Sequence, residues 1–261
     1  MKTKVLLLCL ALFTASFSIC AANETVKGNG KIVTKEISIS DYEKVSVAGS
    51  LTFEYEQSNA APYLRVEVDE NILPLLDIRT ENGGLKVGPK KNKNINPTVF
   101  KVKSNSKNLA EVNSAGSGKF IVISSLDVSR LKLSKAGSGR IELKKSVKGT
   151  TLLANMAGSG EIIVKDLKVE ELKCSHAGSG SISVNGEAKN AAYDLSGSGS
   201  IKAFGCKVEN VKASLAASGG IEVFATSNLN ASVAGSGSIK YKGEPELKKS
   251  VVGSGSIKKV N

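Results

Sequence analysis

The chain has 261 residues, a formal net charge of +12, 41% hydrophobic and 5% aromatic residues, one histidine and no tryptophan. This length suits one large all-β domain or two ordinary domains. The lysines are dispersed and aromatic residues for base stacking are few, which argues against a nucleic-acid partner and favours acidic glycans, lipopolysaccharide, an anionic membrane face or a plainly solvated surface.

Residues 1–22 have the pattern of an export signal: two lysines, an apolar run at residues 5–13 and then small residues. A transmembrane anchor is the alternative, but the run is too short and no stop-transfer segment follows. Cleavage after Ala22 is favoured over lipidation at Cys20, because Ile19 stands where a lipoprotein signal normally has a small residue. We therefore expect a protein of the periplasm, the outer-membrane surface or the extracellular space.

Residues 23–110 contain short segments typical of β coils and hairpins. Glycine-containing segments at residues 28–32 and 47–53 lie 21 residues apart, like two coils of one repeat. Strand-like stretches, a short helical turn containing Pro74 and a basic, asparagine-rich loop follow, at residues 63–68, 85–87, 69–76 and 90–97. We expect this part to continue the sheet of the following repeat, and a separate small sandwich is the alternative.

Residues 111–261 carry a Gly-Ser-Gly motif that returns every 18–21 residues. Its first residue falls at Gly116, Gly137, Gly158, Gly178, Gly197, Gly235 and Gly253, with a degenerate copy at Ala217-Ser218-Gly219. Such a period in a chain rich in Val, Ile and Ser predicts a β-solenoid in which each repeat forms one coil.

The repeat alternates between apolar and polar residues with period two, and residues 131–143 show this directly through the glycines. This predicts a strand with one buried face, both glycines inward and the serine outward. Two residues after the second glycine, the copies carry a column of large apolar residues: Phe120, Ile141, Ile162, Ile182, Ile201, Ile221, Ile239 and Ile257. Stacked coils would place this column inside.

The outward serines are the candidate binding surface: Ser117, Ser138, Ser159, Ser179, Ser198, Ser218, Ser236 and Ser254. They would form a stripe at the strand spacing of ~4.8 Å. The structural interpretation is a ladder of hydroxyls that bond from coil to coil beside a bend. The functional interpretation is a flat, regular contact surface, on which Ser159→Lys with Ser179→Lys would abolish binding without unfolding the protein.

Several stretches together resemble the putative auto-transporter adhesin head (GIN) domain family. They are Tyr42 to Ser50, Val66 to Leu73, the Gly-Ser-Gly copies, Tyr241 to Leu247 and Gly253 to Ile257, and the likeness covers roughly residues 28–261. The resemblance implies an exported bacterial protein with a right-handed β-helix, similar in shape to pectin lyases, without assigned catalytic residues and with a proposed role in cell adhesion. The degenerate copy at Ala217 departs from the pattern and puts uniform spacing there in doubt.

Catalytic, cofactor and metal sites do not emerge from the sequence. A lyase or hydrolase needs paired carboxylates or a basic catalyst at one face, whereas His176 occupies an inward phase typical of a buried structural residue. Lys135 shares that phase, which suggests that its coil opens to solvent. Cys174 and Cys206 stand at different phases of the repeat, so they are better interpreted as small buried residues than as a disulfide or metal ligands.

We therefore expect a non-enzymatic, exported β-helix that acts as an adhesion or interaction module toward a glycan or a surface protein of host or bacterium. The alternative is a carbohydrate-active or carbohydrate-binding protein that recognises acidic polysaccharide. We expect no nucleic acid, cofactor or transmembrane segment, and self-association through open ends or flat faces is a further alternative.

Overall fold

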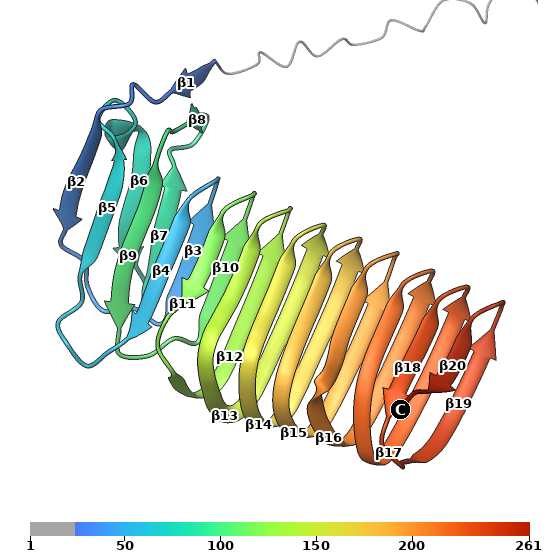
Figure 1. The fold of residues 1–261 in the computed structure, drawn as a ribbon. Coiled ribbons are helices and arrows are strands. Elements are labelled where there is room, and N and C mark those ends of the chain that lie inside the picture. The colour runs from blue at the N-terminus through green and yellow to red at the C-terminus, as the bar shows by residue number, and fades with distance from the viewer. Residues whose placement is uncertain (1–23) are drawn as a thin grey trace, which may run out of the picture.

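The computed structural model describes residues 24–261, which form an all-β fold (Figure 1). The predicted export signal, with its cleavage after Ala22 or lipidation at Cys20, lies outside the described residues.

The N-terminal part contains nine strands and one short 3-10 helix: β1 (Thr25–Lys27), β2 (Ile32–Ile37), β3 (Lys44–Ala48), β4 (Thr52–Gln57), β5 (Leu64–Asp69), η1 (Leu73–Leu75), β6 (Leu76–Glu81), β7 (Gly84–Pro89), β8 (Asn94–Asn96) and β9 (Phe100–Ser106). The repeat contains β10 (Glu111–Ala115), β11 (Lys119–Val122), β12 (Leu126–Ala136), β13 (Arg140–Gly158), β14 (Glu161–Gly178), β15 (Ser181–Ser196), β16 (Ser200–Ala217), β17 (Gly220–Gly235), β18 (Ser238–Lys242), β19 (Glu246–Val252) and β20 (Ser256–Lys259).

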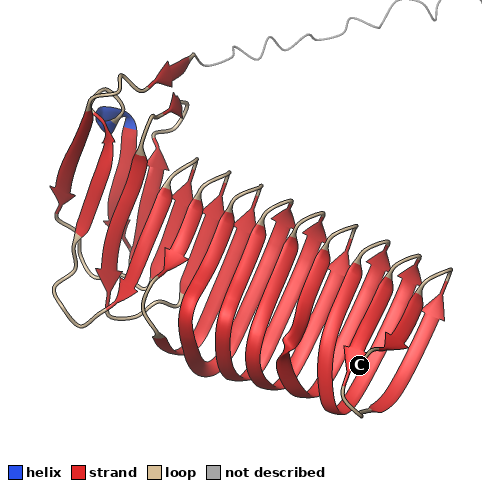
Figure 2. Cartoon of the chain, viewed as in Figure 1, coloured by secondary structure: helices blue, strands red, loops and turns tan. Residues whose placement is uncertain are grey.

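Residues 111–259 form a β-solenoid of about seven turns with coils of about 20 residues, as the repeat predicts. The strands pair in parallel with the equivalent strands of the neighbouring coils. We call the strand segments that lead up to the Gly-Ser-Gly motif the first stack, in the spatial order β7, β3, β10, β12 to β17 and β19. The segments that leave the motif form the second stack, and the motifs between them form the apex, the row of loops along the upper edge in Figures 1 and 2.

The predicted apolar column is confirmed. Phe120 pairs with Ile141, Ile141 with Ile162, and the register continues to Ile257. The first seven members are fully buried, and Ile257 in the last coil is half-buried. Each buried aliphatic side chain contributes roughly 1.5–3 kcal/mol, and stacking them in register is what allows successive coils to stabilise one another.

The prediction of a strand running straight through the glycines, with both glycines inward, was wrong in part. β12 ends at Ala136 and β13 begins at Arg140, so the motif is a turn between two strands. The second glycine, Gly139, is buried and faces inward, but Gly137 is exposed and has a φ of +94°, a value that L side chains rarely adopt. The apolar–polar alternation still continues through the motif in the sequence. This is because the residues after the turn point inward at the same positions as they would in a continuous strand.

The degenerate copy keeps the spacing of the solenoid. Ala217 pairs with Gly235 in the regular register, and Ala217 itself takes a φ of +100° where the other copies have glycine. The doubt about uniform spacing is thereby removed, at the cost of a strained alanine.

Ala217→Gly is therefore expected to stabilise the protein by about 1 kcal/mol, because relief of the strained φ outweighs the extra freedom of glycine in the unfolded chain. Denaturant unfolding followed by circular dichroism measures the change. The matched control is Ala216→Gly on the preceding strand residue, which has no such strain and should lose about 0.5–1 kcal/mol. Equal destabilisation by both substitutions would contradict the assignment of strain to Ala217.

The N-terminal strands extend both stacks, although their order in space differs from their order in sequence. β3 and β4 pair in parallel with β10 and β11 on one side and with β7 and β9 on the other. β6, β5 and β2 then add antiparallel strands at the end of the solenoid. The expected coil at residues 28–32 was wrong, because β2 pairs antiparallel with β5, whereas η1 agrees with the predicted helical turn at Pro74.

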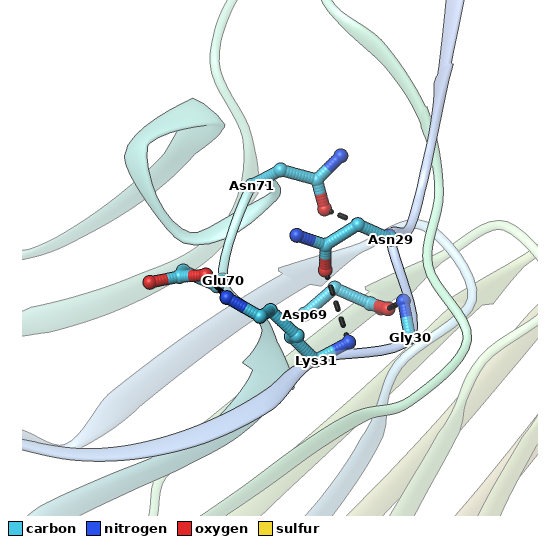
Figure 3. A network of polar contacts seen from close by, with 6 residues as sticks. All are labelled: Asn29, Gly30, Lys31, Asp69, Glu70 and Asn71. Atoms are coloured by element: carbon cyan, nitrogen blue, oxygen red, sulfur yellow. Dashed lines mark hydrogen bonds and ion pairs between the residues drawn. The ribbon is translucent and has the colours of Figure 1, made fainter.

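A polar clasp holds the N-terminal segment against this end (Figure 3). The buried carboxylate of Asp69 accepts hydrogen bonds from the backbone N–H groups of Gly30 at 2.8 Å and Thr98 at 2.7 Å, and Asn71 accepts one from the N–H of Asn29 at 3.0 Å. Burial acts to raise the pKa of Asp69, but these donors outweigh it and hold the pKa below its usual value. The clasp therefore depends on an ionised carboxylate.

Candidate functional site

The predicted serine stripe lies along the apex, and all eight serines are exposed. Backbone bonds join the apical turns, for example from the N–H of Ser179 to the carbonyl of Gly158 at 3.1 Å. Across residues 24–261 no hydrogen bond connects the serine hydroxyls, so the hydroxyl ladder of the structural interpretation does not form. The stripe is a regular row of exposed hydroxyls along turns that backbone hydrogen bonds join to one another.

Beside the apex, the outer surface of the first stack carries an apical groove with a volume of about 660 Å³. Two columns of small side chains line it, one of alanines and one of serine, asparagine and aspartate: Ala115, Ala136, Ala157 and Ala177, and Asn113, Ser134, Asn155, Ser175 and Asp194. Because these side chains are short, a partner could approach the sheet closely along several coils.

Nearer the base, the same surface carries a second, basal groove of about 700 Å³. A ladder of asparagines runs along it: the Nδ2 of Asn190 donates to Glu171 at 2.6 Å, that of Asn210 to Asn190 at 2.9 Å, and that of Asn228 to Asn210 at 2.7 Å. Each amide in the middle of the ladder uses one donor and one acceptor here, which leaves a second N–H and a lone pair for other contacts.

Next to the asparagine ladder lies a row in which every second coil presents a lysine; we call it the lysine row. In spatial order the row reads Lys44, Glu111, Lys132, Leu153, Lys173, Ala192, Lys212, Asn230 and Lys248. Sequence reasoning missed this row, although four of its five lysines, all except Lys44, stand five residues before the first position of a Gly-Ser-Gly copy.

The middle of the lysine row differs from its flanking parts in how the charges are balanced. Lys132 forms an ion pair with Glu111 at 2.9 Å, and Lys248 is 4.0 Å from Glu246. Lys173 and Lys212 are exposed and form no ion pair within residues 24–261. The middle of the lysine row therefore presents two ammonium groups that no ion pair balances.

Two buried ionisable side chains of the repeat, Lys135 and His176, point into the solenoid and serve its structure. Lys135 is only 2% exposed, and its Nζ donates to the carbonyl oxygens of Gly116 at 2.7 Å and Ala136 at 2.8 Å. The expectation that this coil opens to solvent was wrong, because those carbonyls satisfy the ammonium group; desolvation lowers the pKa of Lys135. His176 is buried as its phase predicts, with Nδ1 3.3 Å from the carbonyl of Met156.

The cysteines are buried and free, as their phases indicate. Burial raises the pKa of Cys206 to about 11, and that of Cys174 still further, so both remain thiols at neutral pH. Among residues 24–261 there is no group of three His, Cys, Asp or Glu side chains placed to hold a metal ion. That part of the chain also contains no helix with the length and hydropathy of a membrane span.

The comparisons with known proteins agree with this architecture. A solved structure named as a putative lipid binding protein from Parabacteroides distasonis is 48% identical, with a TM-score of 0.90, and the match covers 91% of this chain and 100% of that one. Putative adhesins from Parabacteroides merdae and Parabacteroides distasonis are 37% and 34% identical, with TM-scores of 0.88 and 0.86 and the same coverage. A search of curated proteins found no match.

The family model described as "Putative auto-transporter adhesin, head GIN domain" matches residues 41–147 and 132–245, which together span most of the chain. The resemblance inferred from the sequence motifs is thereby confirmed. This chain belongs to the auto-transporter adhesin head (GIN) domain family.

Proposed function

We propose that this protein is an exported, non-enzymatic adhesion module that holds its partner on the outer face of the first stack. The observation that carries the proposal is the pair of grooves on that face, which present small side chains, amides and free lysines in register along a rigid sheet. Membership of an adhesin head family supports it. The burial of Lys135 and His176 supports a binding role over a catalytic one, because each side chain is only 2% exposed although both residues contribute to the lining of the apical groove.

Two other functions compete with this proposal. The alternative of a carbohydrate-active protein rests on the basic grooves and on the solenoid shape. Lipid binding is the printed name of the 48% identical relative, and the alanine column of the apical groove is the surface that would suit an acyl chain. A chain on that outer surface would stay half in water, whereas the interior of the described solenoid is filled by packed aliphatic side chains; adhesion therefore fits this chain better.

The test is a binding screen with residues 23–261 against glycan arrays, matrix-protein arrays and lipid vesicles, combined with a lyase assay on uronate polymers. We expect binding to a glycan or a matrix protein and no cleavage product. Cleavage of a uronate polymer would overturn the non-enzymatic assignment, and failure to bind any surface would overturn adhesion. Binding confined to vesicles would replace adhesion by the lipid alternative.

The serine stripe is the second contact surface of the same module, and Ser159→Lys with Ser179→Lys tests it in the same screen. Both side chains are exposed at the apex, so the fold should be retained. Loss of binding in this variant would place the contact on the apex, and full binding would leave the serines as turn residues.

A further inference from the structure

We propose that the lysine row and the asparagine ladder form a binding site for a linear acidic polysaccharide that carries one carboxylate on every second sugar. The proposal rests on the proposed adhesion function and names its ligand class. It assigns the site to the basal groove of the first stack, between Arg130 and Lys248.

The spacing of the lysines matches the spacing of the carboxylates on such a polysaccharide. Neighbouring coils lie one strand spacing apart, and lysines on alternate coils are therefore separated by about 9.6 Å, twice the ~4.8 Å of parallel strands. A pyranose in an extended chain is about as long as one strand spacing, so a disaccharide spans two coils. A polymer with alternating neutral and acidic sugars thus places each carboxylate at the same interval as the lysines.

The charges along the row carry the second step. Lys173 and Lys212 are exposed and free of ion pairs in the described chain, and the coil between them contributes the neutral Ala192. Glu171 lies two residues before Lys173 in the same groove, where it occupies the ladder position of that coil and accepts a hydrogen bond from Asn190 at 2.6 Å. The centre of the lysine row therefore alternates between a cation and a neutral position.

The asparagine ladder carries the third step. Asn190 and Asn210 occupy neighbouring coils beside the lysine row, and each retains hydrogen-bonding capacity after the ladder bonds are made. Amides that both accept and donate on three consecutive coils suit the hydroxyls of the sugars, both charged and neutral. The groove therefore combines a lysine on every second coil with a neighbouring row of amides on the coils of β15, β16 and β17.

The alternation has a competing explanation, which is that lysines on adjacent strands would repel one another. That explanation concerns the folded protein alone and predicts no preference among polysaccharides. The two explanations therefore separate in a binding measurement.

The probe is a hyaluronan decasaccharide, whose sugars are alternately acidic and neutral, and affinity is measured by titration calorimetry with residues 23–261. The comparison ligands are a polygalacturonate oligosaccharide of the same length, charged on every sugar, and a neutral cello-oligosaccharide. We expect the alternating ligand to bind most tightly and its affinity to fall as salt is raised, because exposed charges are screened. Equal or tighter binding of polygalacturonate would overturn the match of spacing.

The decisive variant is Lys173→Glu with Lys212→Glu, which we expect to weaken hyaluronan binding about tenfold or more, since each reversal turns an attraction into a repulsion. The matched control is Lys202→Glu with Lys240→Glu. These two lysines are also exposed and also two coils apart, with Glu222 between them, but they lie on the second stack. We expect the control to bind like the native protein.

Unchanged binding by the Lys173 and Lys212 variant would overturn this site while leaving the adhesion function in place. A native protein that binds no surface in the broad screen would instead overturn the function itself. Should the double reversal perturb folding, Lys173→Gln with Lys212→Gln removes the two charges without adding new ones, and retained affinity in that variant would equally overturn the site.

Discussion

Gly139→Ala is expected to destabilise the solenoid by roughly 3–5 kcal/mol, more than the same substitution at the first glycine of its turn. Gly139 is the second glycine of its turn and faces the interior. A Cβ at this position would overlap the carbonyl oxygen of Gly118 on the neighbouring coil, which itself accepts the N–H of Arg140. Backbone blocks the space, so no side-chain rotation relieves the overlap.

The two glycines of the motif differ in what they tolerate. Ala217 occupies the first position of its copy, so an alanine can be accommodated there in spite of the positive φ. At the second position all eight copies have glycine. A Cβ at Gly137 would lie 2.8 Å from the carbonyl oxygen of Gly116, a milder overlap than the one at Gly139. We therefore expect Gly137→Ala to cost about 1–2 kcal/mol for its unfavourable φ, plus a smaller steric penalty, and less in total than Gly139→Ala.

Thermal and denaturant unfolding followed by circular dichroism measures these effects. Ser138→Ala is the control within the same turn; its side chain is exposed, so a change within about 0.5 kcal/mol is expected. A Gly139→Ala protein as stable as the Ser138→Ala protein would contradict the close backbone packing at the apex.

The sequence was sufficient to predict the solenoid because coil stacking repeats the same physical requirement in every copy. The inward position two residues after the second glycine is apolar in all eight copies, and it is the column that the structure places in the core. The turn itself was not predictable from alternation alone. A buried Gly139 and a left-handed Gly137 give the same period-two pattern as a continuous strand, since glycine has no side chain to reveal its direction.

The candidate site was only partly predictable. The exposure of the apical serines was predicted from their outward position in the apolar–polar alternation. The lysine row became evident only once the coils were aligned in space. The signal was present in the sequence, since Lys173 and Lys212 both stand five residues before the first position of a copy. The spatial order of the N-terminal strands could not be predicted from the sequence. β7 and β9 follow β3 and β4 in sequence, yet they pair with the edges of β3 and β4 that face away from the repeat.

Removing two lysines from the last coil, by Lys249→Val with Lys259→Val, is expected to convert the protein into end-to-end dimers or larger assemblies. Within the described chain β19 pairs only with β17, and β20 only with β18, so both present an unpaired edge. Val251 and Val252 in β19 are 42% and 69% exposed. An unpaired edge with exposed apolar side chains is a template for pairing with another chain.

Lys249 and Lys259 oppose pairing at this end of the solenoid, because they occupy inward positions of the last coil. Lys249 lies over the buried Ala231, and Lys259 lies over the half-buried Tyr241, which packs against the core. Lys249 is also the central residue of β19, so antiparallel pairing of two copies about a two-fold axis would place two ammonium groups opposite each other. Like charges in directly opposed positions destabilise such pairing, and valine at both positions would replace that repulsion with apolar contact.

Sedimentation velocity at several protein concentrations measures the effect. The native chain is expected to sediment as a monomer, and the Lys249 and Lys259 variant as a dimer or larger species. Lys248→Val with Lys258→Val is the matched control, since these lysines are the outward neighbours of the same two residues and their loss removes equal charge without exposing an apolar end. Association of the control to the same extent would show that net charge, and not the inward lysines, keeps the ends apart; a monomeric Lys249 and Lys259 variant would show that the open edge is not competent for pairing.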